Sequence, residues 1–215
     1  MTCDLFDIEI LLRERTCAIW TFAGGTAMIS GRIWNWPFRR TAPPRLTGDP
    51  AGYLVRFDGA TAGEVVRRDL TIPNSVGWSP DGRTMYFTHT TANTILAWDY
   101  APGDGGLSRE RVLYRHDGPG GLDGFRVDVE GNIWHAVYGE ARVIKISTAG
   151  RVLGEVRLPT RNITCPEFVG TELFITTAAD EEGEGGAQSR EFGGGLYRID
   201  VGVGGVPAYP FKPAA

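Results

Sequence analysis

The sequence predicts an all-β protein made of repeated small sheets, and three observations lead to this fold class. Short runs of β-branched and aromatic residues alternate with turn residues from about residue 50 onward. Thirty glycines and 13 prolines are spread between these runs. Together they make up about 20% of the 215 residues, compared with an ordinary share of roughly 12%. Similar strand-and-turn segments recur at Gly31, Gly82 and Gly131, which lie 51 and 49 residues apart. A β-rich period of roughly 40–50 residues is typical of a propeller of four-stranded blades.

The individual strands follow from apolar runs that alternate with polar residues or are bounded by turns. In chain order we expect strands at residues 53–57, 75–78, 84–88, 94–98, 125–128, 133–137, 143–146, 172–176 and 196–199. Turns are expected at residues 79–82 (Ser-Pro-Asp-Gly) and 130–131 (Glu-Gly). Beyond the N-terminal ~20 residues no stretch keeps the 3.6-residue period of a helix. At roughly 45 residues per blade the chain holds fewer than five blades, which predicts an incomplete propeller of about four.

Composition and charge exclude several classes of function. The chain has 22 basic and 26 acidic residues and no block of Lys or Arg, which argues against nucleic acid or an anionic membrane as a partner. No apolar run approaches the ~20 residues needed to span a bilayer, and the N-terminus lacks the basic region of a signal peptide. The cysteines, Cys3, Cys17 and Cys165, fit a reducing compartment better than a disulfide framework. We therefore expect a cytoplasmic protein.

One position repeats in a way that suggests chemistry. Ala23, Asn74 and Asp123 each lie eight residues before a repeat glycine. Because the innermost strands of successive blades surround one channel, Asn74 and Asp123 are expected to meet at its mouth. Amide and carboxylate oxygens are hard ligands that suit calcium, magnesium or manganese and can also hold zinc. The alternative is that Asn and Asp merely begin strands after turns, as they often do.

Three segments resemble a known family. Residues 71–87 (TIPNSVGWSPDGRTMYF) are similar to its "L-x-x-P-N-G-[LI]-x-W-S-P-D-G-x-x-[LM]-Y" stretch. Residues 122–134 (LDGFRVDVEGNIW) are similar to "P-D-G-x-x-x-D-x-E-G-x-[LI]-W", and residues 195–207 (GLYRIDVGVGGVP) to "G-x-L-[FY]-x-[IV]-D-V-G-V-x-G-x-P". The family is that of gluconolactonase and regucalcin (senescence marker protein), which also includes the luciferin-regenerating enzyme. The resemblance is good over residues 50–212 and weaker over 22–38.

This resemblance implies a fold, an activity and a set of site residues. The fold is a six-bladed propeller, and its central channel holds one divalent cation (calcium, zinc, magnesium or manganese). In the family a Glu of the first blade, an Asn and an Asp hold the metal, and Asn74 and Asp123 match the last two. Asp123 also matches the general base, which takes a proton from the water that attacks a small sugar lactone. The resemblance thus predicts a metal-dependent lactone hydrolase of the gluconolactonase type.

The chain also departs from the family pattern. The early "E-G-P-x-W" motif that supplies the metal Glu is absent, since Glu9 and Glu14 stand in no such context. Ala23 and Gly24 replace an Asn and an Asp of the substrate site, and Ser75 stands where the family has Gly. We therefore expect an unmatched segment at 1–21 and a propeller region at 22–215 that covers the C-terminal part of the family, a pattern typical of a truncated or mis-spliced gene. The alternative function is an inactive scaffold that at most binds a cation weakly and self-associates through exposed blade edges.

Two further features are expected to be structural. His135 follows Trp134 in an inner strand, and a packed histidine is favoured over one that lines the channel. The acidic segment 180–186 lacks the alternating ligands of a calcium loop, so a solvated surface loop is favoured.

Overall fold

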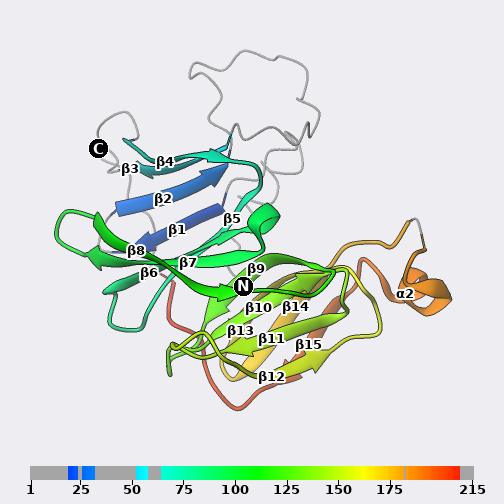
Figure 1. The fold of residues 1–215 in the computed structure, drawn as a ribbon. Helices are drawn as coiled ribbons and strands as arrows, with labels where there is room; N and C mark the ends of the chain where they lie inside the picture. The colour runs from blue at the N-terminus through cyan, green and yellow to red at the C-terminus, as the bar shows by residue number, and fades with distance from the viewer. Residues whose placement is uncertain (1–18, 24–25, 32–51, 58–63, 182, 209–215) are drawn as a thin grey trace, which may run out of the picture.

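The computed structural model describes residues 19–23, 26–31, 52–57, 64–181 and 183–208, which form mostly β-strands (Figure 1). The first sheet contains β1 (Ile19–Ala23), β2 (Thr26–Gly31), β3 (Gly52–Phe57) and β4 (Glu64–Leu70). The second contains β5 (Pro73–Trp78), β6 (Thr84–His89), β7 (Thr94–Ala101) and β8 (Gly106–Arg115). The third contains β9 (Gly121–Val127), β10 (Ile133–Tyr138), β11 (Arg142–Ile146) and β12 (Val152–Arg157). The fourth contains β13 (Ile163–Val169), β14 (Glu172–Thr177) and β15 (Leu196–Asp200).

Every sheet is antiparallel, and its strands lie side by side in the order in which they occur in the chain. The first strands of successive sheets contact one another, β1 with β5, β5 with β9, and β9 with β13. This is the blade arrangement that the repeat predicts, and the all-β fold class is confirmed. The described helical segments, the 3₁₀ turn η1 (Thr90–Ala92) and α2 (Gly186–Phe192), are both far shorter than a membrane span requires.

The hydrophobic core lies between neighbouring sheets. Leu54 and Phe87 belong to the cluster between the first and second sheets, and Phe125 to the cluster between the second and third. A third cluster joins the third and fourth sheets. Gly77 is needed for this packing, because a Cβ there would lie 2.7 Å from the ring of Phe125. Among the described residues, the second and third blades are thus packed by apolar side chains on both faces, and the first and fourth on one face.

The first sheet differs from the expected register. Gly82 and Gly131 lie in the turns after β5 and β9, but Gly31 lies at the end of β2. Ala23 therefore ends β1, whereas Asn74 and Asp123 lie near the beginnings of β5 and β9. The prediction that Ala23 shares their position is wrong. In the other two repeats the turn contains an acidic residue followed by glycine, whereas Ser30 precedes Gly31 and both belong to strand β2.

Candidate active site

The structure brings Asn74 and Asp123 together, although 49 residues separate them in the chain. They lie on β5 and β9, which are in contact (Figure 1). Asn74 Nδ2 donates a hydrogen bond to Asp123 Oδ1 at 2.7 Å. The amide of Asn74 and the carboxylate of Asp123 therefore meet between two inner strands, as the repeated position predicts.

Ser75 joins the same two strands beside this pair. Its backbone N–H donates to Asn74 Oδ1 at 2.9 Å, and its buried hydroxyl accepts the N–H of Phe125 on β9 at 3.0 Å. The backbone of Ser75 does not have a positive φ. Serine at a position where the family has glycine thus needs no strained backbone and supplies an extra link between β5 and β9.

Burial controls the charge state of Asp123. Removal of the carboxylate from water raises its pKa to about 6, and the hydrogen bond from Asn74 opposes that rise. The carboxylate is therefore mainly ionised at pH 7 but holds its charge less easily than an exposed aspartate. Groups with such environments are frequent at functional sites.

The donor set suits a hard divalent cation. Asn74 and Asp123 offer an amide and a carboxylate oxygen, the ligand types that calcium, magnesium and manganese prefer. The described part of the chain contains no cluster of three or more His, Cys, Asp or Glu side chains that could hold a metal ion. Glu9, Glu14 and Gly24 lie outside the described residues. The residues present fit a cation held by two protein oxygens, with water needed to complete its coordination shell.

His135 is a packed core residue, as predicted. Its ring is fully buried against Phe125, with Nε2 2.8 Å from Thr88 Oγ1 and Nδ1 2.9 Å from the carbonyl oxygen of Ala136. Burial lowers the pKa of His135 to about 4, although the bond to the carbonyl opposes this shift. The imidazole is therefore neutral and serves the core.

The acidic segment is only partly a solvated loop. Glu181 is exposed, as expected, but Asp180 is buried and accepts the backbone N–H of Gly185 at 2.9 Å. Glu184 pairs with Arg161. The segment is thus a surface loop anchored by one buried aspartate, and α2 begins at its last residue, Gly186, which the sequence pattern did not predict.

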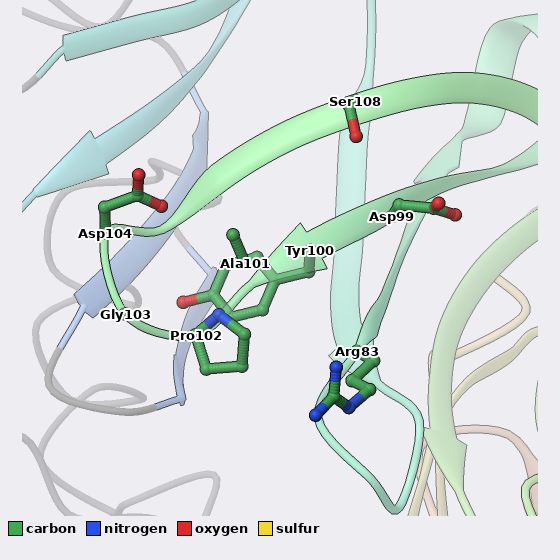
Figure 2. A pocket seen from close by; sticks show the side chains of 8 residues that line it. All are labelled: Arg83, Asp99, Tyr100, Ala101, Pro102, Gly103, Asp104 and Ser108. Atoms are coloured by element: carbon green, nitrogen blue, oxygen red, sulfur yellow. The ribbon is translucent and has the colours of Figure 1, made fainter.

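A hollow of about 540 Å³ lies elsewhere on the second sheet (Figure 2). Residues 99–104 of the β7–β8 hairpin line it, together with Arg83 and Ser108. Arg83 follows the turn between β5 and β6, at the other end of β5 from Asn74. None of the predicted site residues lines this hollow, so it is separate from the Asn74–Asp123 pair.

Residues 26–179 match the family model described as SMP-30/gluconolactonase/LRE-like region. The chain belongs to this family. A pentonolactonase of Haloferax volcanii is 33% identical over 188 residues, which cover 84% of this chain and 62% of the relative. Regucalcin of Danio rerio is 34% identical over 198 residues, which cover 88% of this chain and 65% of the relative. The chain thus spans less than two thirds of the length of these relatives.

Solved structures agree on the fold. A luciferin-regenerating enzyme superposes with a TM-score of 0.76 at 24% identity, over 95% of this chain and 68% of that one. A calcium-binding protein, regucalcin of Agrobacterium tumefaciens, superposes with a TM-score of 0.72 at 24% identity, over 90% and 62%. The predicted family and its propeller architecture are confirmed.

Proposed function

We propose that the chain hydrolyses a small sugar lactone at the Asn74–Asp123 site. The observation that carries this proposal is the 2.7 Å contact between the two side chains at the beginnings of neighbouring inner strands. Relatives named pentonolactonase and sugar lactone lactonase support the same reaction class. The few, dispersed cysteines support the cytoplasm as its place of action.

Asp123 is the proposed general base. Its carboxylate takes one proton from the attacking water as the oxygen bonds to the lactone carbonyl carbon. The ring C–O bond then breaks, and the proton passes to the departing ring oxygen, so that one lactone and one water give one hydroxy acid. Asn74 holds the carboxylate in place through its amide N–H. A divalent cation bound by Asn74 and Asp123 oxygens would supply polarisation of the carbonyl and stabilise charge on its oxygen.

The second candidate is a propeller scaffold without turnover. It is favoured by the absence, among the described residues, of any cluster of three or more His, Cys, Asp or Glu side chains that could hold a metal ion. Site affinity for a cation depends on ligand charge and number, so two protein ligands predict weak binding. The two candidates differ in one measurable quantity, the rate of acid release.

The test is hydrolysis of glucono-1,5-lactone and of a pentonolactone by chelator-treated protein, before and after addition of calcium or manganese. A rate above that of buffer, increased by a cation and abolished in Asn74→Ala, is the expected result. The exposed carboxylate of Glu181 provides the matched control, because Glu181→Gln should keep the wild-type rate. A wild-type rate equal to spontaneous hydrolysis would contradict the lactonase and support the scaffold.

A further inference from the structure

Thr90 connects both members of the candidate site, although nothing in the sequence pattern marks it. It begins the η1 turn after β6. Its Oγ1 accepts a hydrogen bond from Asn74 Nδ2 at 3.1 Å and donates one to the carbonyl oxygen of Leu122 at 2.8 Å. Leu122 is the residue immediately before Asp123. One hydroxyl thus contacts the ligand side chain on β5 and the backbone that carries the carboxylate on β9.

The directions of these hydrogen bonds determine how the amide of Asn74 is turned. A hydroxyl has one hydrogen, and Thr90 gives it to a carbonyl that can only accept. Thr90 can therefore only accept from Asn74, which requires the amide nitrogen to face it. The two hydrogens of that nitrogen are both used, one by Thr90 and one by Asp123. A reversed amide would place its oxygen against a carboxylate and against a hydroxyl with no hydrogen to offer.

The turn that carries Thr90 is itself anchored to the site. The backbone N–H of Thr90 donates to the carbonyl oxygen of Ile72, just before β5, at 3.1 Å. Asn93, which ends the turn with a left-handed φ of 50°, donates from Nδ2 to the Gly120 carbonyl at 2.8 Å and accepts the Leu122 N–H at 2.9 Å. The Thr90 hydroxyl is thus presented from a segment bound to the beginnings of both inner strands.

We propose that Thr90 is a positioning residue, which fixes the Asn74 amide so that its oxygen and not its nitrogen is available to a divalent cation. The inference rests on the proposed cation site. It assigns Thr90 a role that acts through Asn74, without direct contact to cation or lactone. Groups that orient metal ligands in this way typically change metal affinity by 10–100-fold when they are removed.

Calorimetric titration of the chelator-treated protein with calcium and with manganese tests the proposal. Thr90→Val keeps the shape of the side chain and removes the hydroxyl, and it should weaken cation binding about 10-fold or more. Thr90→Ser restores the hydroxyl and should bind the cation like wild type. Thr91→Val is the matched control, because Thr91 lies in the same turn, is exposed, and contacts His89 Nε2 at 3.1 Å.

A second measurement separates orientation from general damage. The side-chain amide protons of Asn74, followed by ¹⁵N-edited NMR without cation, should show loss of one hydrogen bond in Thr90→Val and not in Thr91→Val. Should Thr90→Val fail to fold, Thr90→Ala takes its place in both measurements. Wild-type affinity and unchanged amide signals in a folded Thr90 variant would overturn the inference and leave the proposed function standing. A wild-type protein that binds neither cation would overturn the cation site and the inference with it.

Discussion

Strand β9 has an aspartate near each end, and the surroundings of the two carboxylates differ. Asp128, just after the strand, is completely buried and hydrogen-bonded on both oxygens. Oδ1 accepts the backbone N–H groups of Glu130 at 3.1 Å and Asn132 at 2.8 Å, and Oδ2 accepts Trp134 Nε1 at 2.9 Å. These contacts close the turn between β9 and β10 and attach it to the β10 tryptophan.

Asp123, near the beginning of β9, is only half-buried and has one donor, Asn74, to its carboxylate within the described residues. Lys145 Nζ lies 3.4 Å from Asp128 Oδ2, whereas the structure describes no cationic partner within 4 Å of Asp123. A carboxylate whose lone pairs are all used by the protein can only be structural. One that is left with lone pairs at reduced solvation can accept a proton or a cation.

Exchange of Asp for Asn at position 123 should have the largest effect on function. Asp123→Asn keeps the size of the side chain but removes its charge and basicity, and general-base help contributes typically 10²–10⁴-fold to the rate. We expect a loss of lactone hydrolysis of that order. The free energy of unfolding should not fall, because a charge that burial disfavours has been removed. Initial rates of acid release and urea unfolding measure the two quantities.

The same exchange at position 128 should lower stability and leave the rate of hydrolysis unchanged. Asp128→Asn places an NH₂ group where two donors now find an acceptor, so the free energy of unfolding should fall by about 2–4 kcal/mol. The rate per folded molecule should be close to that of wild type. If Asp128→Asn lost activity without loss of stability, the division between a structural and a chemical end of β9 would be wrong.

Glu140 is a second carboxylate whose hydrogen bonds are made by the protein, and its contribution to stability can be measured as a function of pH. Burial raises the pKa of its carboxylate, but hydrogen bonds from His116, the Gly120 N–H and Arg142 outweigh burial and lower it from 4.5 to about 2. Because the folded protein holds this charge more easily than the unfolded chain, Glu140 stabilises the fold above pH 4.5, and this contribution is lost as the pH falls toward 2.

Glu140→Gln should therefore be less stable than wild type at pH 7, and the difference should shrink as the pH falls below about 4.5. Urea unfolding at several pH values measures it, with Glu181→Gln as the exposed control. A difference in unfolding free energy that stays constant from pH 7 to pH 3 would contradict the assigned pKa of Glu140.

The smallest effect is expected from Ser75, whose hydroxyl lies behind the site. Ser75→Ala leaves the buried N–H of Phe125 without its acceptor, which should cost about 1 kcal/mol. For a chain of this size that corresponds to a decrease in melting temperature of roughly 2–4 °C. Calorimetric unfolding checks it, and an unchanged melting temperature would show that the link between β5 and β9 adds nothing to stability.

The sequence alone determined the middle strands of the second and third blades, but it did not predict β13, the first strand of the fourth blade. The expected strands at 84–88, 133–137 and 143–146 coincide with β6, β10 and β11, because their apolar side chains are buried on both faces. The outermost strands β4, β8 and β12 were not predicted. Most of their side chains are exposed or partly exposed, so no apolar pattern distinguishes them from loops, and pairing with the neighbouring strand makes them β.

The site divides in the same way. The repeat of about 50 residues was enough to predict that Asn74 and Asp123 meet, because equivalent positions of neighbouring inner strands converge. Only the tertiary structure showed that Thr90 lies against both, since the register between β5 and β6 and the η1 turn bring it there from 16 residues away. The repeated position and the family motif singled out Asp123, and only the structure showed what holds Asp128. Both aspartates stand in a matching family motif, but the donors to Asp128 come from its own turn and the following strand, whereas the donor to Asp123 comes from β5, 49 residues earlier, and only folding brings so distant a residue within 2.7 Å.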